Sequence, residues 1–170
     1  MELKNKTRKL EFKEVENTID ELLNEYGEKA AEIAKSPISI YETENLMSLQ
    51  EEMSLKIFNT FEIDKYKTTG QYILKSSISA NREKYIYKTL LGKILRLIPA
   101  GVTILSVGIN SSLARRFTLA LGYAISQLSK VYINLIIDNK DMDAADVFTK
   151  EAIEDLMESY LIEYNKTVLN

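Results

Sequence analysis

The stretch LIPAGVTILSVGIN, residues 97–110, decides how the whole chain is interpreted, because it is apolar and uncharged yet contains a proline and two glycines. No charged residue lies between Arg96 and Arg115, and a second uncharged run extends from Phe117 to Ser129. Two interpretations compete. Residues 97–129 form either a hydrophobic helical hairpin that inserts into a membrane, or two core helices of a soluble helical domain.

The details of the first run favour the soluble core. Pro99 interrupts the run near its start and Asn110 begins a polar end, so the continuous apolar part spans only about 12 residues, which is short for a membrane span. Pro99 separates two helices, because proline ends one helix and suits the first turn of the next. Gly101 and Gly108 lie seven residues apart on one helix face, where small residues allow close helix packing.

The remaining segments have amphipathic patterns that are suited to covering such a core. Apolar residues recur at steps of three and four over residues 15–33 and 42–61, and residues 81–98 and 144–166 carry an apolar face. Further helices are expected over 100–108 and 112–137, and a shorter one over 64–74. The chain is therefore predicted to be all-α, a single helical-bundle domain of six to seven helices around a central apolar helix pair. Residues 1–35 are predicted to form an N-terminal amphipathic helix that can project from a helical domain of residues 36–170.

The composition excludes several kinds of chemistry. The chain of 170 residues contains no cysteine and no histidine, so a cysteine nucleophile, a redox dithiol, a Ser-His-Asp triad and the usual zinc sites are excluded. Phosphate-loop, dinucleotide-binding and EF-hand patterns are absent from the sequence. We therefore expect no catalytic residues, no metal site and no cofactor, and the protein is not expected to be an enzyme.

The charges give no reason to expect a nucleic-acid partner. The formal net charge of −3 arises from nearly balanced acids and bases, and the ten tyrosines are scattered at helix positions that suit packing at the edge of a core. The stretch KNKTRKLEFK, residues 4–13, is locally basic. A solvated helix start is the first interpretation of it, and contact with a phosphate or a lipid headgroup is the alternative.

Two parts of the sequence resemble a known family. LMSLQEEMSLKIFNTFEI contains Gln50 and Met53, and LIPAGVTILSVGINSSLARRFTLALGYA follows about 50 residues later. Together they resemble the helical domain of uncharacterised function that occurs C-terminal to Era-like GTPase domains and in YcjF-like membrane-associated proteins of bacteria. The resemblance covers about residues 36–166. The matching positions are Gln50, Met53, Pro99, Gly108, Ile109, Asn110, Ala114, Thr118 and Gly122, and Gly101 belongs to the same motif.

The sequence departs from the family pattern at two points. The family turn Pro-Gly-x-Gly is replaced by Pro99-Ala100-Gly101, and the GTPase domain itself is missing, so the chain is either a stand-alone member or a piece of a longer GTPase.

The resemblance implies a non-enzymatic helical interaction or regulatory module, associated with a GTPase domain in cis or in trans. We also expect a cytoplasmic location, with association at the inner-membrane surface and homo-oligomer formation as further hypotheses. Arg115 and Arg116, between the two apolar runs, are the candidate surface contacts. The alternative function is that of a membrane-inserting or membrane-surface protein that uses the hairpin of residues 97–129.

Overall fold

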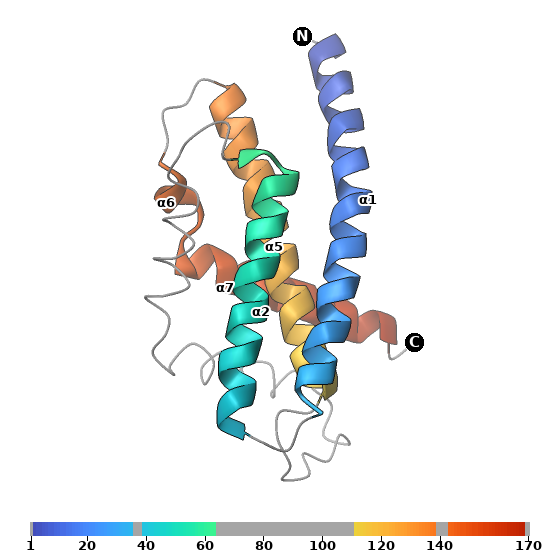
Figure 1. Cartoon of the computed structure of the whole chain (residues 1–170). Coiled ribbons are helices and arrows are strands. Elements are labelled where there is room, and N and C mark those ends of the chain that lie inside the picture. The colour runs from blue at the N-terminus through green and yellow to red at the C-terminus, as the bar shows by residue number, and fades with distance from the viewer. Residues whose placement is uncertain (1, 36–38, 64–110, 139–142, 169–170) are drawn as a thin grey trace.

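The computed structural model describes residues 2–35, 39–63, 111–138 and 143–168, and these residues are almost entirely helical, with no strand among them (Figure 1). This confirms the predicted all-α class for the described part of the chain. The expected helices over residues 64–74, 81–98 and 100–108 lie outside the described residues. The described helices are α1 (Glu2–Ile33), α2 (Ser39–Thr60), α5 (Ser111–Ile137), α6 (Ala144–Val147) and α7 (Lys150–Val168).

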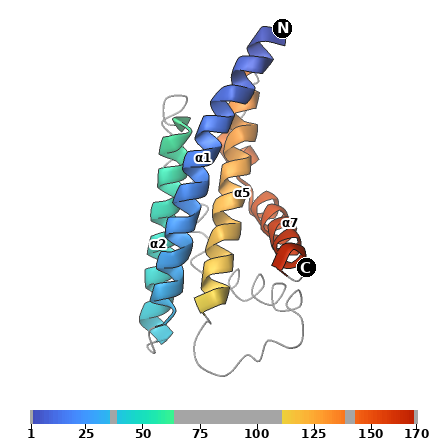
Figure 2. The same cartoon turned by 90° about the vertical axis from the view of Figure 1, so that its right-hand side faces the viewer.

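Helix α5 is the central element of this part of the molecule. It contacts α1, α2, α6 and α7, and Figure 2 shows α1 and α2 on one side of it and α7 on the other. Its sequence explains this position, because the run from Phe117 to Ser129 carries no charge and can be buried on more than one face. Thirteen of its residues are buried, spread from Ala114 to Ile133.

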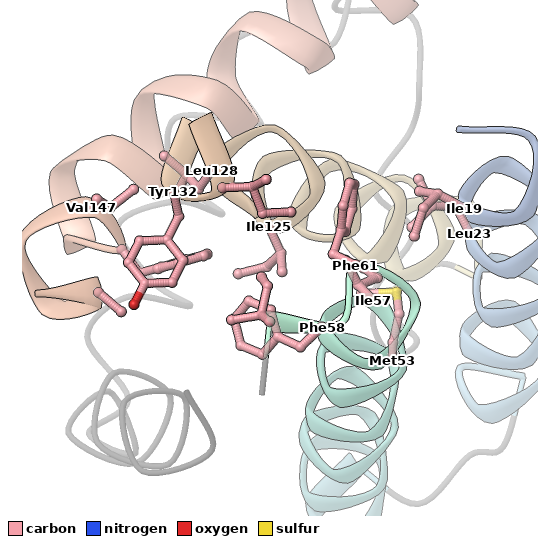
Figure 3. Close-up of a cluster of buried hydrophobic side chains, with 14 of the residues drawn as sticks. Ile19, Leu23, Met53, Ile57, Phe58, Phe61, Ile125, Leu128, Tyr132 and Val147 are labelled. Carbon is pink, nitrogen blue, oxygen red and sulfur yellow. The ribbon is translucent and has the colours of Figure 1, made fainter. Parts of the chain in front are cut away.

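The largest core cluster lies where α1, α2, α5 and the segment around α6 meet (Figure 3). Burial of each large side chain in it contributes roughly 1.5–3 kcal/mol to folding. A second cluster joins α5 to α7 and consists of Phe117, Ala120, Ala124, Met157 and Leu161. The first cluster includes Ile19 and Leu23 from α1, Met53, Ile57 and Phe58 from α2, Ile125, Leu128 and Tyr132 from α5, and Val147 from α6.

Helix α1 is part of this core along most of its length. Phe12 and Val15 pack against the first cluster, and Ile19, Leu23 and Tyr26 are buried in it. The start of α1 extends beyond the ends of α2 and α5 in both views (Figures 1 and 2). The packing from Phe12 onward gives no boundary near residue 35, so the division into 1–35 and 36–170 stays a prediction.

The single helix expected over residues 144–166 is wrong, because the structure divides it into α6 and α7 at Phe148 and Thr149. Phe148 leaves the helical conformation, with φ −89° and ψ 52°, and its ring packs at 5.1 Å, nearly perpendicular, against the Phe58 ring. Asp143 caps α6 by accepting a hydrogen bond from the Ala145 N–H, and Thr149 Oγ1 accepts from the Ala152 N–H at the start of α7. Burial of the Phe148 ring and the cap from Thr149 therefore outweigh helix continuity.

Candidate functional site

Four residues of the family resemblance meet at one buried contact between α2 and α5. Gln50 Nε2 donates a hydrogen bond to Thr118 Oγ1 at 3.2 Å, and both side chains are buried. One turn further along each helix, Met53 lies against Gly122. The two pairs are spaced by three and four residues, as neighbours on one helix face are. Ala114 is buried elsewhere on α5, in a cluster with Ala30 and Leu46. The remaining motif residues lie outside the described part of the chain: Pro99, Gly101, Gly108, Ile109 and Asn110.

Gly122 marks a very close approach of three helices. A Cβ atom placed on it would lie 2.1 Å from Leu23 Cδ2 on α1 and 3.1 Å from Met53 Sδ on α2. A contact of 2.1 Å is far inside the van der Waals distance, so any larger side chain forces Leu23 or the helices to move. Gly122 therefore has a packing role, since its lack of a side chain lets both α1 and α2 reach α5 at the same level.

The buried polar groups near this contact are satisfied locally. The Ser54 hydroxyl donates to the Gln50 carbonyl at 2.8 Å, and the Ser129 hydroxyl donates to the Ile125 carbonyl at 2.8 Å. Hydroxyls that bond to the carbonyl one turn earlier are a common solution inside helices. Among the described residues, none of these hydroxyls bonds to a carboxylate or an amine, and the Gln50–Thr118 hydrogen bond of this contact holds the helices together.

The two arginines expected to form one surface contact point toward different partners. Arg115 Nε lies 2.8 Å from Glu28 Oε1 and links α5 to α1. The Arg116 guanidinium lies 5.3 Å from the centre of the Tyr164 ring and links α5 to α7. Both side chains are half-buried. The pair therefore spans the two sides of α5.

A row of tyrosines, which sequence reasoning placed only as separate packing residues, lies between α5 and α7. The rings of Tyr123 and Tyr160 are 5.1 Å apart, those of Tyr160 and Tyr164 are 6.0 Å apart, and Arg116 lies over the last ring. Burial raises the pKa of Tyr160 above its usual value, so the hydroxyl stays protonated near neutral pH. The spacing of Tyr160 and Tyr164, four residues apart on α7, is the signal that places both on one helix face.

A second group that sequence reasoning missed joins α1 to α2. The Tyr26 ring is buried and its hydroxyl donates a hydrogen bond to Glu52, while Lys29 Nζ and Lys56 Nζ lie 4.7 Å and 5.1 Å from the ring centre. Burial, and then this hydrogen bond, raise the pKa of Tyr26. The same bond lowers the pKa of Glu52. The apolar stripe of α1 predicted that Tyr26 faces the core, but no local pattern indicates a partner 26 residues away.

The described residues offer little for metal binding. Within residues 12–35, 45–63, 111–138 and 143–164, no group of three acidic side chains is placed to hold a metal ion. The absence of catalytic residues, metal and cofactor in the protein stays a prediction.

One described helix meets the length and composition criteria for a membrane span. Helix α5 has 27 residues and is apolar enough to cross a bilayer, but half of its apolar window is buried against the rest of the structure. A buried core helix of a soluble protein meets the same criteria.

Comparisons with protein-family models, with curated proteins and with solved structures find no match. The resemblance to the helical domain associated with Era-like GTPases therefore stays a hypothesis.

Proposed function

We propose that this protein is a non-enzymatic helical interaction module that binds a GTPase domain, in cis or in trans. The observation that carries the proposal is the meeting of Gln50, Met53, Thr118 and Gly122 at one buried contact. The resemblance selects these residues from two helices, and Gln50 and Thr118 are 68 positions apart in the chain. They nevertheless have a common structural role. Residues that define a fold are expected to meet in this way. The contact therefore supports the relation to the helical domain of Era-like GTPases, from which the proposed GTPase partner is inferred.

The complete fold in this proposal is a bundle of six to seven helices. Its central apolar pair consists of α5 and a helix that contains Gly101 and Gly108. The module acts in the cytoplasm, at or near the inner membrane, and forms a homo-oligomer or binds its partner as a monomer. Its role is to position or regulate the GTPase domain, with no reaction of its own.

Isothermal titration with a GTPase domain encoded in the same reading frame, or next to it, tests the proposal. The chain is expected to bind with an affinity that differs between the GDP form and the form with a non-hydrolysable GTP analogue, because regulation requires different affinities for the two states. Arg116→Glu is expected to weaken binding, whereas Lys35→Glu, which makes the same change of charge at the far end of α1, serves as the control. The absence of binding in both nucleotide states contradicts the proposal.

A membrane-inserting function is the second candidate, favoured by the length and apolar composition of α5. Insertion of the hairpin of residues 97–129 requires α5 to separate from α1 and α2. Contacts of α5 with lipid would then replace its buried contacts with these two helices. The Glu28–Arg115 ion pair offers a way to prevent this exchange, because the two residues face each other across α1 and α5.

The chain has no cysteine, so Glu28→Cys and Arg115→Cys together introduce the only two thiols. Linking them with a short bismaleimide holds α1 on α5. If the hairpin inserts, the unlinked double variant is protected from protease by liposomes and the linked form is not. Equal behaviour of the two forms contradicts insertion by release of α5, and the Glu28→Cys single variant, which cannot be linked, is the control for modification.

A further inference from the structure

The first three turns of α1, residues 2–13, differ from the rest of the chain in charge and in their place in the fold. They contain five lysines and arginines and two glutamates, a net charge of +3, whereas the whole chain carries −3. The remaining residues therefore carry −6. In both views α1 begins beyond the ends of α2 and α5 (Figures 1 and 2). At the end of these turns, Phe12 packs against the core and Lys13 is exposed. We call residues 2–13 the basic arm.

The helical register places charged residues at the core-facing positions of the basic arm. The core-facing stripe of α1 includes Phe12, Val15 and Ile19, at steps of three and four residues. Continued toward the start of the helix, the same stripe falls on Arg8 and Lys4. Burial of a charged side chain without a partner is costly, so these positions favour a helix that has left the core. The basic arm is thus built to extend past the bundle.

The other side of the basic arm carries a different pattern. Leu3 and Leu10 lie seven residues apart on one helix face, with Lys6 and Lys13 at the neighbouring positions of the same face. Leucines interleaved with lysines are typical of helices that lie in the interface of a membrane. In such helices, leucines reach the boundary of the acyl chains, while lysine stems run along it and place their charges among lipid phosphates.

We propose that the basic arm docks this protein on an anionic phospholipid surface. The charges favour that surface, because phosphate and carboxylate headgroups attract the +3 arm. They also repel the rest of the chain, which carries −6, so that contact is limited to the arm. The leucines distinguish lipid from a nucleic acid, which would gain nothing from apolar side chains on the same face as the lysines. The proposal is independent of the GTPase partner. It also differs from hairpin insertion, which does not require negative lipid charge.

Vesicle flotation of the full chain provides the test. Vesicles of phosphatidylcholine alone are compared with vesicles that contain about 30% phosphatidylserine, at salt concentrations that change the Debye length from about 10 Å to about 3 Å. Binding is expected only to the anionic vesicles and is expected to weaken as salt rises. The variant with Lys6→Gln, Lys9→Gln and Lys13→Gln is expected to lose roughly a hundredfold in partitioning, at about fivefold for each base removed.

A matched control removes three bases elsewhere. Lys29→Gln, Lys35→Gln and Lys56→Gln change the net charge equally, in exposed ion pairs away from the arm, and are expected to leave vesicle binding within about threefold of the unmodified chain. Circular dichroism checks that both triple variants keep their helix content.

Four results overturn the proposal. They are equal binding to neutral and anionic vesicles, equal losses in the two triple variants, no binding to either vesicle, and unchanged binding of Leu10→Ser. The Leu10→Ser variant is expected to lose about tenfold or more, because one buried leucine side chain contributes at least that much. If the chain bound neutral and anionic vesicles equally but still bound the GTPase domain, the proposed function would stand and only membrane docking by the basic arm would be rejected.

Discussion

The two sides of α5 are packed in different ways. Toward α1 and α2, contact is made at Gly122, where the neighbouring side chains approach the backbone itself. Toward α7, contact is made by Phe117 and two alanines against Met157 and Leu161, with the row of tyrosines along one edge. Side chains that contact other side chains adjust their positions more easily than side chains that lie directly on a helix backbone. The α1–α2 side is therefore expected to be intolerant of added volume at the level of Gly122, and the α7 side tolerant.

The largest effect is expected for Gly122→Val. The new Cβ would overlap Leu23 Cδ2, and the added methyl groups would reach Met53, so we expect a loss of about 3 kcal/mol in the free energy of unfolding. Urea denaturation followed by circular dichroism measures it. Leu23→Ala in the same chain is expected to recover part of the loss, because it removes the atom that the new side chain meets.

Gly27→Ala is the matched control, since Gly27 is also inside a helix but would place its Cβ at 3.1 Å and 3.3 Å from side-chain atoms of Leu119 and Arg115. Alanine gains about 1 kcal/mol of helix propensity over glycine, which offsets the small adjustment required. A result near zero is expected. If Gly27→Ala and Gly122→Ala have the same effect on stability, the proposed difference between the two sites is wrong.

The second effect concerns the buried hydrogen bond on the same side of α5. Thr118→Val keeps the shape of the side chain but leaves the Gln50 amide without its partner, so we expect a loss of about 2 kcal/mol. Replacing both residues, with Gln50→Leu and Thr118→Val, is expected to cost less than Thr118→Val alone. Additive losses in this double-mutant cycle would contradict a direct interaction between the two side chains.

These contacts show what the sequence can and cannot predict. The apolar period of three and four residues indicated the helix that became α2 and the part of α1 from Val15 onward, because periodicity follows from one helix facing one core. It did not indicate the break at Phe148, since Phe148, Ala152 and Leu156, at steps of four residues, continue a helical pattern across it and only Thr149, as a helix cap, marks the new start. The Tyr26–Glu52 bond depends on how α1 and α2 pair, which no local pattern specifies.

A third, smaller effect is expected for Tyr26→Phe, which removes the hydroxyl that bonds to Glu52 between α1 and α2. We expect a loss of about 1 kcal/mol near neutral pH, since the Glu52 carboxylate stays partly exposed to water. Thermal or urea unfolding across the pH range measures the loss. Gln50 and Ser54, which lie beside Glu52 on α2, are not substituted.

The pH dependence of this loss has a defined sign. The pKa of Glu52 is lowered in the folded state, so its stabilising contribution is present above the ordinary value of 4.5 and is lost as pH falls through the lower folded pKa. The pKa of Tyr26 is raised, so its contribution is present below the ordinary value of 10.0 and is lost as pH rises through the higher folded pKa. The difference between Tyr26→Phe and the unmodified chain should therefore be constant from about pH 6 to pH 9 and shrink outside it. A constant difference down to pH 3 would contradict the role of the Glu52 carboxylate.

The smallest effect tests the two sides of α5 through the adjacent arginines. A double-mutant cycle of Arg115→Gln with Glu28→Gln is expected to give a coupling energy of about 0.5 kcal/mol that declines in 1 M salt, because the ion pair faces solvent. The cycle of Arg116→Gln with Tyr164→Leu is expected to give about 0.5 kcal/mol, from contact between the guanidinium and the ring. Close contact with an aromatic face is screened less than an exposed ion pair, so this coupling should persist in salt. Equal salt dependence would mean that both arginines act as simple surface charges, and the contrast between an ionic link to α1 and an aromatic link to α7 would not hold.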